Sequence, residues 1–227
     1  MSTRNIEIEK ALREVQDRVF EAAKNAGRSA EEITLIVVTK NYPSSDVDIL
    51  RRLGMTNFGE NRDAEGARKS TEVRGTWHFQ GQIQSNKIHS IAHWADVVHS
   101  LDDARHVVFL NREVPEGKNM AVFIQVSLDK SPGRGGVDPS QLEPLAELIV
   151  KSANLQLQGL MAVAPLDENP ESAFARLSLI HTNFRQQFPQ SISLSAGMSN
   201  DFETAIAYGA THIRIGSSIL GSRTNAL

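Results

Sequence analysis

Short runs of β-branched and apolar residues alternate with helix-length segments along nearly the whole chain, and no other feature limits the fold as strongly. The strand-like runs lie near 33–39, 57–59, 76–79, 96–99, 120–126, 156–161, 191–195 and 211–215. Successive runs start about 20 to about 36 residues apart, as repeated βα units require. Eight such units predict an α/β fold, a single-domain (β/α)8 TIM barrel over residues 1–227. A doubly wound open sheet is the alternative.

An amphipathic segment precedes the first strand-like run. Its apolar residues recur at spacings of four and three, which places them on one helical face: Ile8, Leu12, Val15, Val19 and Ala22. Gly27 is expected to end this helix. We therefore expect an extra N-terminal helix that covers one side or end of the barrel.

The composition excludes several classes of function. The 24 basic and 27 acidic residues give a net charge of −3 without a basic run, so nucleic acid is not an expected partner. There are no cysteines, which excludes disulfides, thiolate metal sites and cysteine nucleophiles. His89 and His93 share helical spacing, but no third ligand accompanies them, and no metal site is predicted. No apolar segment is long enough for a signal core or a bilayer span, so we expect a cytoplasmic protein that does not contact the membrane.

Lys40 stands where the first strand-like run ends, after seven uncharged residues at 33–39. A lysine at such a position is an amine held in place and partly dry, which can lose its proton and attack a carbonyl. The alternative is a lysine that marks the exit of the strand into solvent.

Two loops near the end of the chain combine glycine with serine. Ser199 follows the seventh strand-like run, and Gly216 and Ser217 follow the eighth. Exposed backbone N–H groups at helix starts bind phosphate, and the loops after strands seven and eight form the usual phosphate site of a barrel. Either loop alone is typical of a helix cap and a turn, but the two together favour a phosphorylated ligand. With Lys40 across the mouth, a ligand with an aldehyde and a phosphate is indicated, and pyridoxal 5′-phosphate has both.

Arg214 lies two residues before the second of these loops. If its side chain points inward, it could reach the pyridine nitrogen of that cofactor. The alternative is an outward arginine that pairs with a carboxylate on a neighbouring helix.

Seven segments then match one known pattern in order: VVTK (37–40), FGEN (58–61), WHFQGQIQSNK (77–87), KSPGRGG (130–136), GLM (159–161), LSAGMSND (194–201) and RIGSSILG (214–221). With them the chain resembles the pyridoxal phosphate homeostasis proteins, single-domain relatives of the alanine racemase barrel. The resemblance implies a Schiff base on Lys40, Arg214 near the ring nitrogen and a serine–glycine phosphate cup. The implied cofactor-binding residues are Lys40, Asn61, His78, Met198, Ser199, Arg214, Gly216 and Ser217.

The chain departs from the family pattern after the strand. Members often carry a Lys-Thr-Lys-Pro-like run, whereas residues 40–43 here are Lys-Asn-Tyr-Pro. The second lysine is missing, so any role for it in passing the cofactor along is not expected here.

The residues favour binding over turnover. A guanidinium is always protonated, so a ring nitrogen that accepts from Arg214 stays unprotonated and is a poor electron sink. Racemisation needs an acid or base on each face of the substrate, and racemases take the second from a tyrosine of another domain. Of the two tyrosines, Tyr208 is expected to pack within a helix and Tyr42 to pack in a loop; the alternative is that Tyr42, which is close to Lys40, approaches the site.

The sequence thus predicts a protein that stores or carries intracellular pyridoxal phosphate, with little or no turnover and no catalytic residue. Apo forms of pyridoxal-phosphate-dependent enzymes are the implied recipients, and a monomer or weak dimer is expected. A racemase-like enzyme or a Schiff-base aldolase is the alternative.

Overall fold

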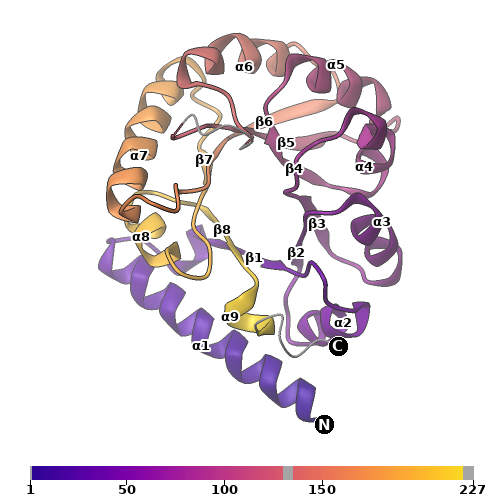
Figure 1. Cartoon of the computed structure of the whole chain (residues 1–227), viewed down its shortest axis with the longest axis vertical. Coiled ribbons are helices and arrows are strands. Elements are labelled where there is room, and N and C mark those ends of the chain that lie inside the picture. Colours follow the sequence, from indigo (N-terminus) through magenta and orange to yellow (C-terminus); the bar gives the residue numbers. More distant parts are fainter. Residues whose placement is uncertain (1, 130–134, 222–227) are drawn as a thin grey trace.

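Eight parallel strands close into a barrel in sequence order in the computed structural model, which describes residues 2–129 and 135–221 (Figure 1). Closure comes from pairing of the first and last strands, with Thr34 opposite His212 and Ile36 opposite Arg214. The predicted barrel is confirmed, because an open sheet would leave these two strands unpaired. The strands are β1 Thr34–Val38, β2 Asn57–Glu60, β3 Thr76–Phe79, β4 Val97–Leu101, β5 Met120–Gln125, β6 Leu155–Met161, β7 Ser193–Ser195 and β8 His212–Ile215.

The strand ends agree with the predicted runs to within two residues. Two ends differ by two residues: β4 continues to Leu101 although the predicted run ended at 99, and β7 begins at Ser193 although the apolar run suggested 191. The backbone N–H of Ser191 donates to the carbonyl of Phe188 at 2.9 Å, so this residue closes a turn after the preceding helix. The Lys-Ser-Pro-Gly-Arg part of the predicted loop, residues 130–134, lies outside the described residues.

Helices surround the barrel, and α1 lies across the side formed by α8 and α9 (Figure 1). Across the described part of the chain, no helix has the length and apolarity needed to cross a membrane. The α-helices are α1 Thr3–Asn25, α2 Ser44–Arg52, α3 Asp63–Glu72, α4 Ile88–Trp94, α5 Ala104–Glu113, α6 Leu142–Val150, α7 Pro170–Gln187, α8 Phe202–Ala207 and α9 Ser217–Leu220. Short 3-10 helices occupy Ala30–Glu32, Ser85–Lys87 and Pro139–Gln141.

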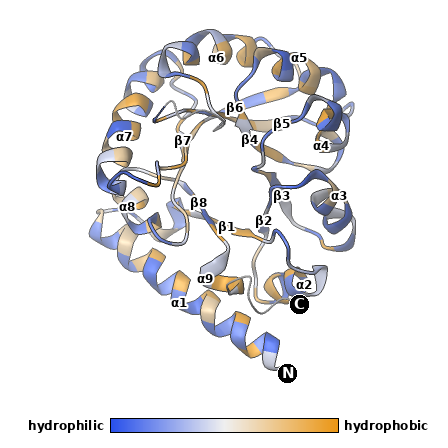
Figure 2. Cartoon of the chain, in the orientation of Figure 1, coloured by the Kyte–Doolittle hydropathy of each residue, from blue (hydrophilic) through white to orange (hydrophobic). Residues whose placement is uncertain are grey.

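The predicted N-terminal helix is present as α1, and hydrophobic and hydrophilic residues alternate along it (Figure 2). Its buried face differs from the prediction at one position, since Ala23 and not Ala22 is fully buried. Ala23 lies four residues after Val19 and so continues the stripe. The helix ends at Asn25, and Gly27 adopts a positive φ of 68°, where glycine has no steric penalty.

Two apolar clusters lie on opposite faces of the strands. The large one fills the space between the strands and the helices, whereas Val97, Phe123 and Met161 form a small cluster on the other face, inside the barrel. Polar side chains share this interior, because successive residues of a strand point to opposite faces. His99 lies two residues after Val97 and stacks on Phe123 with ring centroids 4.5 Å apart.

Gly159 allows β6 to approach β7 closely. Its φ is 153°, and a Cβ at this position would lie 1.8 Å from the carbonyl oxygen of Ser193. No side chain fits there, so the glycine of the GLM segment is needed for β6 to pair with β7 in the observed register.

Candidate functional site

Lys40 lies partly buried, two residues beyond the end of β1, at the mouth formed by the carboxyl ends of the strands. The peptide groups on both sides of it are fixed to α3. The carbonyl of Thr39 accepts a hydrogen bond from Lys69 Nζ at 2.7 Å, and the N–H of Asn41 donates to Glu65 Oε2 at 2.9 Å. Asn41 has a positive φ of 67°, a conformation that asparagine tolerates better than most residues. The lysine therefore stands on a tightly held backbone.

A buried ion pair between Lys69 and Glu60 stabilises the backbone next to Lys40. Lys69 Nζ lies 2.6 Å from Glu60 Oε1, and both side chains are 0% exposed. Thr39 Oγ1 donates to the same carboxylate oxygen at 2.6 Å, while Glu60 Oε2 has no partner among the described residues. Burial raises the pKa of Glu60, and the bonds from Lys69 and Thr39 act in the opposite direction. We did not predict this cluster, although Glu65 and Lys69 share helical spacing, a signal available in the sequence.

Arg214 points inward, which excludes the outward alternative. Its side chain is 5% exposed, and it donates from Nη1 to Ser195 Oγ at 2.8 Å and from Nη2 to the carbonyl of Ala162 at 3.0 Å. Both acceptors are neutral, and within the described ranges no carboxylate lies within ion-pair distance of the guanidinium. Burial lowers the pKa of Arg214 to about 10, although the charge of Asp201 opposes this shift. A buried cation without an anionic partner favours an acceptor-bearing or anionic ligand.

The two serine–glycine loops meet at the mouth. Ser217 Oγ lies 3.1 Å from Ser199 Oγ, and the N–H of Ser218 donates to the same oxygen at 3.4 Å. Gly216 precedes α9, and a Cβ on it would lie 3.0 Å from the carbonyl of Val38, at the end of β1. Hydroxyls and N–H groups from two loops thus converge beside the strand that leads to Lys40, a donor set suited to phosphate oxygens.

Three further residues were predicted for the site: Asn61 and Met198 lie in loops, whereas His78 lies in the barrel interior. Asn61 follows β2, and its backbone touches the loop after β3, where a Cβ on Gly81 would lie 2.0 Å from the Asn61 carbonyl. Met198 donates its N–H to Asp201 Oδ1 at 2.6 Å, and its side chain is 36% exposed. His78 is 2% exposed within the barrel interior, and both of its ring nitrogens have protein partners. The structure therefore does not bring His78 to the mouth.

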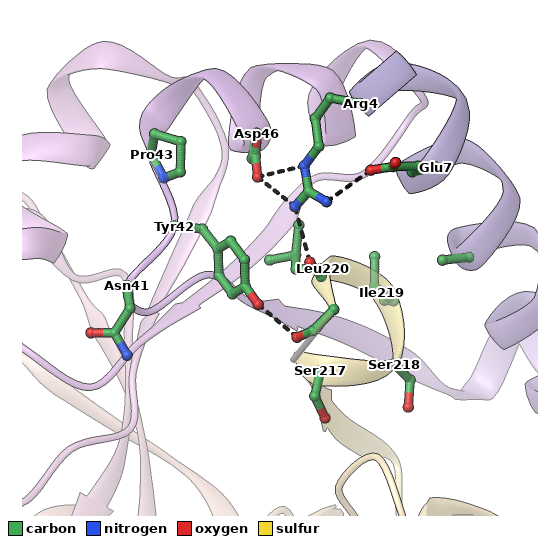
Figure 3. Close-up of a pocket in the computed structure, with 12 residues that line it drawn as sticks. Arg4, Glu7, Asn41, Tyr42, Pro43, Asp46, Ser217, Ser218, Ile219 and Leu220 are labelled. Atoms are coloured by element: carbon green, nitrogen blue, oxygen red, sulfur yellow. Dashed lines mark hydrogen bonds and ion pairs between the residues drawn. The ribbon is translucent and has the colours of Figure 1, made fainter. Parts of the chain in front are cut away.

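A cavity of about 680 Å³ adjoins the mouth between the start of α1, the loop after β1, and α9 (Figure 3). Arg4 borders it and donates to Asp46 Oδ2 at 2.7 Å and to the carbonyl of Leu220 at 3.0 Å. Tyr42 donates its hydroxyl to the carbonyl of Gly221 at 2.6 Å (Figure 3). The charged and hydroxyl groups of Arg4, Asp46 and Tyr42 that line this cavity are thus already hydrogen-bonded within the protein.

The chain is similar to one family model and to curated proteins that share one name. A family model described as alanine racemase, N-terminal domain, matches residues 13–224. A protein of Mycobacterium tuberculosis named pyridoxal phosphate homeostasis protein is 40% identical, with 97% of this chain and 94% of the relative covered. The protein of the same name from Escherichia coli is 35% identical, with 93% and 95% covered.

Solved structures give the same result. PipY of Synechococcus elongatus, with pyridoxal phosphate bound, is similar with a TM-score of 0.83 and 30% identity over 94% of this chain and 100% of that one. D-threonine aldolase from Filomicrobium marinum has a TM-score of 0.73 at 14% identity, over 95% of this chain and 60% of that one. The second likeness concerns the fold alone.

Proposed function

The chain belongs to the family of the alanine racemase N-terminal domain, and from this premise we propose that it binds pyridoxal 5′-phosphate on Lys40 in the intracellular homeostasis of that cofactor. It stores or carries the cofactor with little or no turnover. The names of the similar proteins and the bound cofactor in the PipY structure support this function.

The buried guanidinium of Arg214 is the observation that carries the proposal. Arg214 is 5% exposed, and its hydrogen-bond partners within residues 2–129 and 135–221 are both neutral oxygens, so the guanidinium can still donate to a further acceptor such as the pyridine nitrogen. Bound pyridoxal phosphate supplies an aldehyde and an electron-withdrawing ring. Lys40 would hold the aldehyde carbon, Arg214 would donate to the ring nitrogen, and Ser199, Gly216 and Ser217 would bind the phosphate. Asn61 and Met198 belong to loops that border the same mouth.

Arg214, Tyr42 and Tyr208 are not placed to transfer a proton to or from a substrate. Arg214 has no acceptor and cannot take a proton. The hydroxyl of Tyr42 donates to Gly221, and that of Tyr208 lies 3.3 Å from Glu171 Oε1. Neither tyrosine is therefore poised as the acid on the second face of a substrate, and this arrangement favours carriage over racemisation.

Pyridoxal-phosphate-dependent enzymes that lack their cofactor are the proposed recipients, with the chain acting as a monomer or weak dimer. The test incubates the loaded protein with alanine in D2O and follows loss of the α-proton signal by NMR. We expect exchange no faster than with free pyridoxal phosphate. Sustained exchange at ordinary enzymatic rates, about 1–10³ per second, would overturn the proposal in favour of a racemase-like enzyme.

A further inference from the structure

Five polar side chains form a continuous chain of hydrogen bonds through the barrel interior. Asn57, at the start of β2, has its Oδ1 3.0 Å from Nε2 of His78. His78 Nδ1 lies 2.9 Å from His99 Nε2, and His99 Nδ1 lies 2.8 Å from Ser195 Oγ. Ser195 Oγ accepts from Arg214 Nη1 at 2.8 Å. We call this set of five residues the interior chain; it connects β2, β3, β4, β7 and β8.

The direction of these bonds follows from the number of protons available. His78 and His99 are 2% and 0% exposed, and burial lowers the pKa of both, so each ring is neutral and carries one N–H. Asn57 Nδ2 donates to Thr56 Oγ1 at 3.2 Å, which leaves Oδ1 to accept from His78 Nε2–H. His78 Nδ1 must then accept from His99 Nε2–H, and His99 Nδ1 must accept from the hydroxyl of Ser195.

The opposite direction would leave a buried proton without an acceptor. If Asn57 were turned over, its amide would donate and each histidine would carry its proton on Nδ1. Ser195 Oγ would then accept from both His99 and Arg214, while its own O–H has no further acceptor in the described part of the chain. Ser195 is 0% exposed, so water cannot satisfy that proton.

We propose that Asn57, His78, His99 and Ser195 are positioning residues whose hydrogen bonds all run from Arg214 toward Asn57 and so fix the guanidinium at the mouth. The single proton of Ser195 is committed to His99, which leaves its oxygen as an acceptor for Arg214. With Nη2 bonded to the carbonyl of Ala162, two acceptors in fixed directions define the plane of the guanidinium. The effect on the cofactor rests on the proposed function, but the direction of the bonds does not.

The first test is the protonation site of each histidine in the protein without cofactor. Long-range ¹H–¹⁵N NMR spectra distinguish an Nε2–H imidazole from an Nδ1–H imidazole. Both His78 and His99 are expected as Nε2–H forms at neutral pH. An Nδ1–H form or a protonated ring at either residue would overturn the proposed direction.

The second test separates positioning from packing with two substitutions at one residue. His99→Asn places an amide oxygen near the former Nδ1, where it can still accept from Ser195, whereas His99→Gln places its amide near the former Nε2 and leaves Ser195 without an acceptor. Both variants lose the ring that stacks on Phe123, so a role in packing alone predicts the same change for both.

The dissociation constant of pyridoxal phosphate, measured by absorbance titration, is the readout. We expect His99→Asn to stay within about twofold of wild type and His99→Gln to bind about tenfold more weakly, as loss of one hydrogen bond predicts. Urea midpoints of the two variants should agree with each other, which shows that packing is matched. Equal affinities in the two variants would overturn the positioning role. If wild type does not bind pyridoxal phosphate, the proposed function fails and the positioning role with it, while the NMR result still decides the direction.

Discussion

Replacement of Lys69 by methionine should strongly destabilise the protein, because it leaves the Glu60 carboxylate buried without its cation. Lys69 Nζ bonds to Glu60 Oε1 at 2.6 Å and to the Thr39 carbonyl at 2.7 Å, and its side chain is 0% exposed. Methionine fills a similar volume, so the change removes charge and hydrogen bonds and little packing.

The size of the effect follows from what Glu60 retains. Among the residues that the structure describes, Glu60 Oε2 already lacks a partner, and after the substitution Oε1 keeps only the hydroxyl of Thr39. Breaking a buried ion pair by removing one partner costs about 3–5 kcal/mol of unfolding free energy. Lys69 Nζ also lies 3.2 Å from Glu65 Oε2, but Glu65 is partly exposed and keeps Arg62 at 3.5 Å. The double variant Lys69→Met/Glu60→Gln therefore leaves no buried charge unpaired and should recover to within about 1 kcal/mol of wild type, since neutral replacement of a buried pair is often tolerated.

Equilibrium urea unfolding followed by circular dichroism measures these differences. A loss of about 4 kcal/mol lowers the midpoint by roughly 1–2 M urea at an m-value of about 2–3 kcal/mol/M. Lys151→Met is the matched control, because the Lys151 side chain directly after α6 is 72% exposed and pairs with Glu147 of that helix. This substitution should change the free energy of unfolding by about 0.5 kcal/mol or less. If Lys69→Met lost less than about 1 kcal/mol, or the double variant were as unstable as the single one, the ion pair would not be the source of stability.

Three further predictions concern pH, the barrel wall and the cofactor. Burial lowers the pKa of His212 from 6.5 to about 4, so as the pH falls His212 becomes protonated in the unfolded chain before it does in the folded protein. The free energy of unfolding therefore decreases as the pH drops below about 6.5, by on the order of 1.4 kcal/mol per pH unit. His212→Asn should reduce the slope of unfolding free energy against pH by the equivalent of about one bound proton, and an unchanged slope would contradict this. Gly159→Ala should cost roughly 3 kcal/mol or more in urea unfolding because its Cβ would meet the Ser193 carbonyl, whereas Gly27→Ala, with nothing within 4 Å, should cost only about 1 kcal/mol. Arg214→Leu should weaken pyridoxal phosphate binding by roughly 10- to 100-fold in an absorbance titration, and unchanged affinity would refute the role of the guanidinium.

The strands and the first helix could be predicted because their signal is local. Each strand-like run and the stripe through Ile8, Leu12, Val15 and Val19 is visible within one element, and the barrel follows from the count of βα units. The choice of Ala22 over Ala23 failed because both fit the edge of the stripe, and only contact with the neighbouring helices decides between them.

The direction of individual side chains could not be predicted. Arg214 was left open between an inward and an outward position, because a strand of unknown register gives no face. The interior chain joins five strands that are far apart in sequence, so His78 could not be recognised as one link of it. Lys69 was missed because a lysine in a helix is ordinarily exposed, and its partner Glu60 lies on a different element.

Attachment of the cofactor to Lys40 is tested most directly by reductive trapping. The protein is incubated with pyridoxal phosphate, reduced with borohydride and digested, and the modified peptide is identified by mass spectrometry. We predict an absorbance band near about 420 nm that borohydride removes. The stable adduct should lie on Lys40, and Lys40→Ala should show neither band nor adduct. An adduct on another lysine, or a band that persists in Lys40→Ala, would contradict the assignment.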